Sequence, residues 1–472
     1  MNNQISSLGH SKIRAGAVIF GLLFLLTIQN HTLGFYNPET VKSSYLSDSK
    51  GFSSDFSALQ AESLLRGHID VLPTPVELLL LSDPYDPEQN KLLRESGYHD
   101  LSYFKGKIYS PQGFGAPLLI DLPTRLLGLG YASPPLKSLL LIASGTFFLF
   151  LICEELLSRI RKIPLTKLQN TVLLSIILFS NPATWLLVPG RSYQVPIAAA
   201  YFAINAGAYL TWKGIELCRV LLISCGSIFI GLAFMARPNI ASLVLSVVVI
   251  LGFCSFKLYS KVIFLRHIFF MSLCVGTIIT LWGLLNNARF GSYTQTGHAY
   301  QLAGFNMRNY DIGSSRFITE NLNAYFLTPL QFHREFPFFS LTASNADDSL
   351  NLQQREDLTG LFFAYPLLCM APVFALFLFR SKKQYLSLVA LLFTSSTVSL
   401  ILLSAIFKDS TMRYIPDFST GLVLVTAISV PLYLDFSRSG KMSSFFYRFS
   451  CIAFISVLVI EFNLLLSQCS RC

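Results

Sequence analysis

Carboxylates and arginines are the residues of this chain that could do chemistry, and they gather in polar stretches between apolar runs. Asp55 heads the stretch SSDFSALQAESLLRGHID, where it could cap a helix that ends at Gly67. The same carboxylate could act as a general base that takes a proton from a substrate hydroxyl. The sequence leaves both roles open for Asp55.

Arginines stand at the ends of apolar runs, in the segments PGRSY, ARPN, ARFG and RYIPDF: Arg191, Arg237, Arg289 and Arg413. A guanidinium binds phosphate through paired hydrogen bonds, so such residues suit a lipid-linked phosphate at the membrane surface. Single arginines at the ends of membrane helices also reach lipid headgroups without a specific ligand. We expect Arg237, Arg289 and Arg413 to contact a donor phosphate.

Two further polar stretches are candidates for an acceptor or donor site. DPYDPEQN contributes Asp83 and Asp86, which equally suit a turn. The aromatic stretch GYHDLSYFKGKIYSPQGFGAPLL contributes His99 and Tyr109 as candidates for the acceptor site. It also contains Lys105 and Lys107. The lysines would bind the donor phosphate or only solvate the loop.

Metal, cofactor and nucleic-acid motifs are weak or missing from the sequence. The outer histidines have no H-x-x-x-H spacing with an acid: His68, His99, His298 and His333. A divalent metal is therefore conceivable but unsupported, and no cofactor is required. The nine cysteines lie in or near apolar runs or at the tail, where the closing CSRC is a weak signal. We expect no nucleic-acid partner.

The elements that position these residues are apolar helices. The chain has 472 residues, 52% hydrophobic and 13% charged, with a mean hydropathy of +0.53. Charged residues make up about a quarter of ordinary soluble proteins, so this composition predicts an all-α polytopic membrane protein. We expect eleven spans, near 15–30, 137–157, 170–189, 194–212, 219–236, 239–256, 268–286, 359–379, 385–407, 418–434 and 449–467. The stretch 117–130 would be a twelfth, but it contains Asp121 and Arg125 and better suits an interfacial helix.

Charge placement predicts the orientation of a single integral membrane domain, 1–472. With a cytoplasmic N-terminus, the short inner segments carry 17 of the 36 Lys and Arg, as the positive-inside rule requires. The long segments 31–136 and 287–358 then lie outside the cytoplasm and carry 19 of the 26 Asp and Glu. Loops this long usually have a function of their own.

The chain resembles the GT-C superfamily of membrane glycosyltransferases, and most closely its bacterial mannosyl- or arabinosyltransferase-like members. The resemblance rests on AESLLRGHID, DPYDP, KGKIYSPQGFGAP, an ARP turn, ARFGS with a later YQLAG, and a late RY..DF. It implies transfer of a sugar from a polyprenyl-phosphate donor to a hydroxyl of a lipid, glycan or protein. It also implies a bacterial inner-membrane protein that contacts membrane lipids, with catalysis on the extracytoplasmic side.

The resemblance makes Asp55 the expected catalytic base, with Asp48 as the alternative. Family members commonly carry paired acids at this place, whereas Ser53 and Ser54 precede Asp55 here. Two other functions therefore stay open. The protein could transport or flip lipid-linked sugars, although the internal repeats typical of transporters are missing from the sequence. It could also be a catalytically silent assembly partner.

Overall fold

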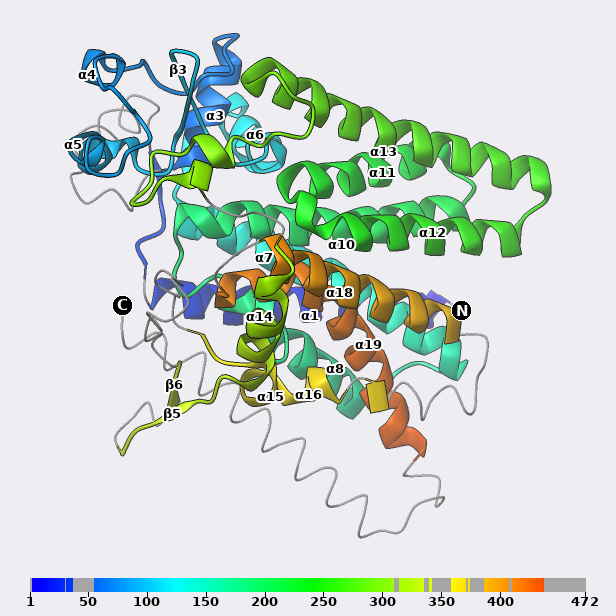
Figure 1. Ribbon diagram of the computed structural model, residues 1–472. Helices are drawn as coiled ribbons and strands as arrows, with labels where there is room; N and C mark the ends of the chain where they lie inside the picture. Colours follow the sequence, from blue (N-terminus) through cyan, green and yellow to red (C-terminus); the bar gives the residue numbers. More distant parts are fainter. Residues whose placement is uncertain are drawn as a thin grey trace.

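Long helices packed side by side form the body of the molecule (Figure 1). The computed structural model describes residues 2–29, 31–36, 55–309, 314–334, 339–341, 358–370, 372–373, 386–406 and 410–436. Asp48 and the expected span 449–467 lie outside these residues. The long helices are α1 (Asn2–Ile28), α7 (Pro134–Arg161), α8 (Lys167–Phe179), α10 (Val195–Glu216), α11 (Val220–Ala236), α12 (Ala241–Leu258), α13 (Lys261–Phe290), α14 (Arg316–Leu327), α18 (Leu386–Ile406) and α19 (Ile415–Phe436).

Among the described residues, five helical stretches are long and apolar enough to cross a membrane: Pro134–Arg161, Pro238–Leu258, Lys261–Phe290, Leu388–Ile406 and Met412–Tyr433. Each contains most of one expected span, so the mostly helical, multi-pass character of the prediction is confirmed. The expected number of eleven spans is not confirmed. The apolar helices α8 and α11 are shorter, with 13 and 17 residues.

Two expected spans are interrupted where proline follows a helix end. Within 170–189, α8 ends at Phe179, and Asn181 caps the short helix α9 (Pro182–Trp185). Within 359–379, the described residues form α15 (Leu361–Ala364) and α16 (Pro366–Cys369). The residue before a proline is disfavoured in the α conformation, so neither stretch continues as one straight helix.

The stretch 117–130 does not form a membrane-spanning helix. It contains a helical turn, Pro117–Asp121, and α6 (Leu122–Leu126). Ten helical residues extend about 15 Å, half of the bilayer's hydrocarbon thickness. Leu126 and Leu127 are 74% exposed, whereas Asp121 is fully buried. This pattern agrees with a short helix that lies against the bundle rather than a twelfth span.

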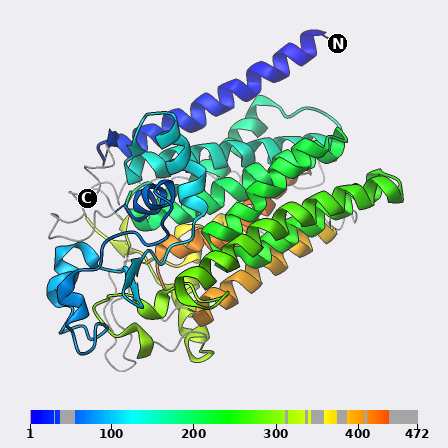
Figure 2. The same ribbon diagram turned by 90° about the horizontal axis from the view of Figure 1, so that it is seen from above.

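The two long polar segments gather at one end of the bundle, which we call the loop end. The opposite end carries the N-terminus and the turn between α12 and α13, and we call it the basic end (Figures 1 and 2). The loop-end helices are α3 (Phe56–Leu65), α4 (Val76–Leu79), α5 (Lys91–Leu93), the turn Arg94–Tyr98, and α6. Sequence segments far apart therefore meet at the loop end.

In the described part of the chain, three two-stranded antiparallel pieces occur at the loop end, in addition to the expected helices. They are β1 (Phe35–Tyr36) with β4 (Tyr131–Ala132), β2 (Ser102–Phe104) with β3 (Lys107–Tyr109), and β5 (Gln331–Phe332) with β6 (Phe339–Ser340). The first polar segment also has its own apolar core, which includes Phe56, Leu59, Leu101 and Ile108. Leu302 of the second segment completes this core.

Candidate functional site

A cavity of about 420 Å³ lies at the loop end, where both polar segments meet the ends of the helices. We call it the arginine cavity, because Arg237, Arg289 and Arg413 all line it. Its other polar lining residues are Asp100, Gln112, Tyr193, Asn239, Thr296, His298, Gln301, Thr411 and Tyr414. The structure therefore brings together three arginines, of which the first and the last are 176 positions apart in the sequence.

Each arginine reaches the cavity from a break between helical elements. Arg237 is extended, at φ −144° and ψ 90°, because Pro238 follows it and ends α11. Arg289 lies in the last turn of α13, which Gly291 ends in the left-handed conformation at φ +70°. Arg413 lies in the 3₁₀ turn Met412–Tyr414 that leads into α19. Each of the three arginines therefore lies at or beside a helix end.

Arg289 is the most deeply buried of the three, with 3% of its surface exposed. Its guanidinium lies over the ring of Phe114 and over the ring of Phe290, with centroid distances of 4.8 and 4.9 Å. It donates hydrogen bonds to the Ser110 carbonyl oxygen at 2.8 Å and to Asn286 Oδ1 at 2.6 Å. Its Nε has no hydrogen-bond partner, and no described carboxylate forms an ion pair with it. A buried cation in this state favours an anionic ligand.

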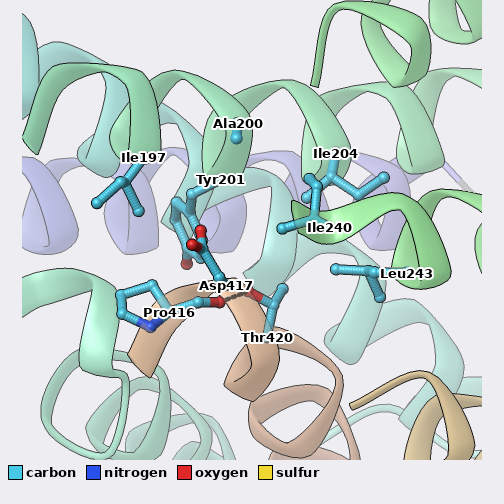
Figure 3. Close-up of a pocket in the computed structure, with 9 residues that line it drawn as sticks. All are labelled: Ile197, Ala200, Tyr201, Ile204, Ile240, Leu243, Pro416, Asp417 and Thr420. Carbon is cyan, nitrogen blue, oxygen red and sulfur yellow. Dashed lines mark hydrogen bonds between the residues drawn. The ribbon is translucent and has the colours of Figure 1, made fainter. Parts of the chain in front are cut away.

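The other two arginines have partners in the wall of the cavity. Arg237 forms an ion pair with Asp417 of α19. Arg413 lies over the ring of Tyr193 at 5.3 Å and over the ring of Tyr414 at 5.2 Å. Asp417 also faces a small cavity of about 10 Å³ behind this wall, opposite Tyr201 of α10 (Figure 3). These contacts fix the directions of both guanidinium groups.

Asp100 is the carboxylate that lines the arginine cavity. Its Oδ2 accepts a hydrogen bond of 2.6 Å from the Tyr193 hydroxyl and lies 3.6 Å from His99 Nε2. Its side chain is 25% exposed, so solvent and small ligands can reach it. Its backbone N–H donates to the carbonyl oxygen of Leu302 at 3.0 Å. Asp100 is therefore held by both polar segments.

His298 lines the same cavity from the second polar segment. Burial lowers its pKa below the usual histidine value, although the negative charge of Asp100 acts in the opposite direction. The imidazole is therefore neutral at pH 7, so it can donate or accept a hydrogen bond but adds no charge.

Close backbone packing carries the stretch SPQGFGAP against the end of α11. A Cβ at Gly113 would lie 1.9 Å from the Met235 carbonyl oxygen, and one at Gly115 would lie 2.5 Å from the Ala236 Cβ. Only glycine allows this approach, which places Pro111 and Gln112 in the wall of the arginine cavity.

Asp55, the expected base, does not line the arginine cavity, although its neighbour Phe56 does. Asp55 is 4% exposed, caps α3 by accepting from Ala58 N, and accepts bonds of 2.8 and 2.6 Å from Lys137 Nζ. Lys137 also forms an ion pair with Asp121. We call these three residues the Lys137 cluster. The structure therefore supports the capping role and engages both carboxylate oxygens of Asp55 with a buried cation.

The remaining predicted site residues lie outside the arginine cavity. Asp83 and Asp86 accept hydrogen bonds from the backbone N–H groups two residues further along the chain, at 3.0 Å each, which agrees with the turn interpretation.

The two predicted lysines contact other residues of the loop. Lys107 lies 3.5 Å from Asp70, and Lys105 lies over the Phe104 ring at 5.3 Å. Tyr109 is 4% exposed and packs on Phe290. Arg191 is exposed. His99 contacts Asp100 beside the cavity.

The sequence interpretation missed Asp100, although it stands in a stretch that was quoted, and it considered His298 only as a metal ligand. The available signal for Asp100 was an acid directly after a histidine at a glycine turn, GYHD, ahead of a strand. Among the described residues, no group of three or more His, Cys, Asp or Glu side chains is arranged to hold a metal ion.

Comparisons with protein-family models, with curated proteins and with solved structures find no match to this chain.

Proposed function

We propose that this protein is a membrane glycosyltransferase that moves a sugar from a polyprenyl-phosphate donor to a hydroxyl acceptor in the arginine cavity. The main support is that Arg289 and Asp100 line the same cavity. The Arg289 guanidinium is buried without a carboxylate partner among the described residues, and Asp100 is accessible. An anion site beside a carboxylate is the pair of groups that this transfer needs. The acceptor is a lipid, glycan or protein outside the cytoplasm.

Asp100 takes the role of general base in this proposal, in place of Asp55 or Asp48. The acceptor hydroxyl loses its proton to Asp100 as its oxygen attacks the anomeric carbon. The bond between that carbon and the phosphate oxygen breaks, and the phosphate keeps the electron pair. Tyr193, which donates to Asp100, holds the carboxylate in place.

Arg289 stabilises the charge that develops on the leaving phosphate. Electrostatic stabilisation is strongest where donors are fixed in advance and water is excluded. The Phe114 and Phe290 rings, Ser110 and Asn286 supply that fixation. Arg237 and Arg413 add positive potential in the same cavity. A monophosphate leaving group needs no metal when guanidinium groups bind it.

The test is complementation of cells that lack the protein, with lipids and envelope glycans analysed by mass spectrometry. Wild-type protein should restore a species that is heavier by one sugar, whereas Asp100→Asn should not. Glu95→Gln is the matched control, because Glu95 is exposed and lies five positions away in the same segment. Normal glycosylation with Asp100→Asn, at equal expression, would exclude the base assignment. Unchanged glycans and lipids in cells without the protein would exclude the enzyme and favour an assembly partner.

A further inference from the structure

A second, larger cavity of about 840 Å³ lies within the helix bundle, between α7, α10, α12, α18 and α19. We call it the basic-end cavity. Most of its lining side chains are Leu, Ile, Val or Phe. Its polar lining residues lie at its two ends, with Asn205 and Thr420 deep in the bundle and Arg159 and Lys257 towards the basic end.

The basic-end cavity is separate from the arginine cavity. The two cavities share no lining residue, although the basic-end cavity runs along α12 from Leu243, near the start of the helix, to Leu258 at its end. Lys257 lies in its last turn. The small cavity of Figure 3 shares Ile204, Leu243 and Thr420 with the basic-end cavity, but no lining residue with the arginine cavity.

The wall that α12 contributes is open to the surroundings of the bundle. Val249, Phe253 and Leu258 line the cavity and are 46%, 49% and 56% exposed. In a bilayer this surface faces acyl chains. An apolar cavity does not bind water well, and an empty one forfeits the dispersion contacts of its lining. A hydrocarbon chain from a neighbouring lipid is apolar, so it suits this lining, and it also supplies the missing dispersion contacts.

The basic rim identifies the headgroup that belongs to such a chain. Lys257 is exposed, its Nζ lies 5.4 Å from the Phe253 ring, and no described acid forms an ion pair with it. Arg159 lies over the Trp212 ring at 4.9 Å, although it also pairs with Glu155 and Glu216. Basic residues at the level of lipid headgroups attract anionic lipids.

We propose that the basic-end cavity binds an anionic glycerophospholipid, with one acyl chain between α10, α12 and α18 and its phosphate at Lys257. This lipid belongs to the leaflet at the basic end, opposite to the one that would supply the sugar donor. The site depends on the insertion of the bundle in a membrane but not on the proposed transferase reaction. The bound chain fills the space between the α7–α10 pair and the α18–α19 pair.

The first test measures phospholipid that remains on the full-length protein after repeated detergent washing. Ala208→Trp fills the cavity, because Ala208 lines it. Leu245→Trp is the control, since Leu245 lies on α12 outside the lining and is 65% exposed. Wild type and Leu245→Trp should retain phospholipid, and Ala208→Trp should lose most of it. Equal retention by both variants, or no retention by the wild type, would overturn the proposal.

A second test does not depend on the folding of the filled variant. Dioleoyl phosphatidylglycerol should raise the Tm of the purified wild type more than dioleoyl phosphatidylcholine does. Lys257→Glu should abolish this difference. Lys261→Glu should keep it, because Lys261, the first residue of α13, is exposed nearby but does not line the cavity. Equal shifts for the two lipids on the wild type, or an undiminished difference in Lys257→Glu, would rule out the proposed headgroup site.

Discussion

Asp100 occupies the left-handed backbone conformation, with φ at +61°, which residues other than glycine rarely adopt. The left-handed region costs a non-glycine residue on the order of 1 kcal/mol, and aspartate tolerates it better than most. The contacts that hold it come from elsewhere in the chain: the Tyr193 hydroxyl and the Leu302 carbonyl oxygen. Such strain is common at functional sites, where it fixes the direction of a side chain.

Arg289→Gln should lower the rate of sugar transfer about 100- to 1,000-fold, because the leaving phosphate loses a fixed positive donor. The transfer rate of Arg289→Lys should lie between those of the wild type and Arg289→Gln, since lysine keeps the positive charge but not the planar guanidinium. The measurement is transfer in membranes that contain equal amounts of each variant. Arg66→Gln is the control, because Arg66 is exposed and lies outside the arginine cavity. Full activity of Arg289→Gln would remove the main support for the proposed anion site.

Asp121 shows how the Lys137 cluster responds to pH. Two carboxylates share one ammonium, and complete burial raises the pKa of Asp121 from its ordinary value of 3.8 to about 7. The folded state therefore binds this proton more tightly than the unfolded state does. The resulting stability is complete below about pH 4 and is lost as the pH rises through about 7.

Asp121→Asn should flatten the dependence of Tm on pH across that window, because the amide does not titrate. Thermal unfolding in detergent between pH 4 and pH 8 measures it. The matched variant is Asp86→Asn, in an exposed turn where the carboxylate accepts from Glu88 N. A fall in Tm with rising pH that is equally steep in Asp121→Asn and wild type would contradict the interpretation.

At the scale of elements, the Lys137 cluster joins three of them. Asp55 begins α3, Asp121 ends the helical turn before α6, and Lys137 lies in the first turn of α7. Lys137 and Asp121 are fully buried. The cluster therefore anchors the first polar segment to the bundle and keeps Phe56, the residue after Asp55, at the arginine cavity.

Lys137→Met should destabilise the protein by about 3–5 kcal/mol, because two buried carboxylates lose their counter-charge. The measurement is the folded fraction in detergent, by size-exclusion chromatography and thermal unfolding. The triple variant Lys137→Met, Asp55→Asn and Asp121→Asn should recover much of the loss, since no buried charge remains. A triple variant as unstable as the single one would show that the cluster acts through packing rather than charge.

At the scale of the whole molecule, the loop end and the basic end differ in charge as well as in structure. The basic end carries an ion-pair network of Arg159 and Lys213 with Glu155 and Glu216. The loop end carries the arginine cavity and most of the acids among the residues that the structure describes. The orientation in which the loop end lies outside the cytoplasm stays a prediction from the positive-inside rule.

Cysteine labelling in spheroplasts tests that orientation. A membrane-impermeant maleimide should label Glu88→Cys, at the loop end, in intact spheroplasts. It should label Lys261→Cys, at the basic end, only after permeabilisation. Both positions are exposed, and the unmodified protein gives the background of its native cysteines. The reverse pattern would place the arginine cavity on the cytoplasmic side and exclude an extracytoplasmic transfer.

The sequence by itself determined the mostly helical, apolar character of the chain, because hydrophobic length acts locally, but it did not determine the breaks within 170–189 and 359–379. It also placed Arg237, Arg289 and Arg413 at helix ends. It could not decide which carboxylate meets them. Asp55 pairs with Lys137, 82 positions away, whereas Asp100 bonds with Tyr193, 93 positions away. A buried ammonium needs a counter-charge wherever packing places it. That demand arises only in the tertiary structure, and it engages Asp55 in the Lys137 cluster and leaves Asp100 to the arginine cavity.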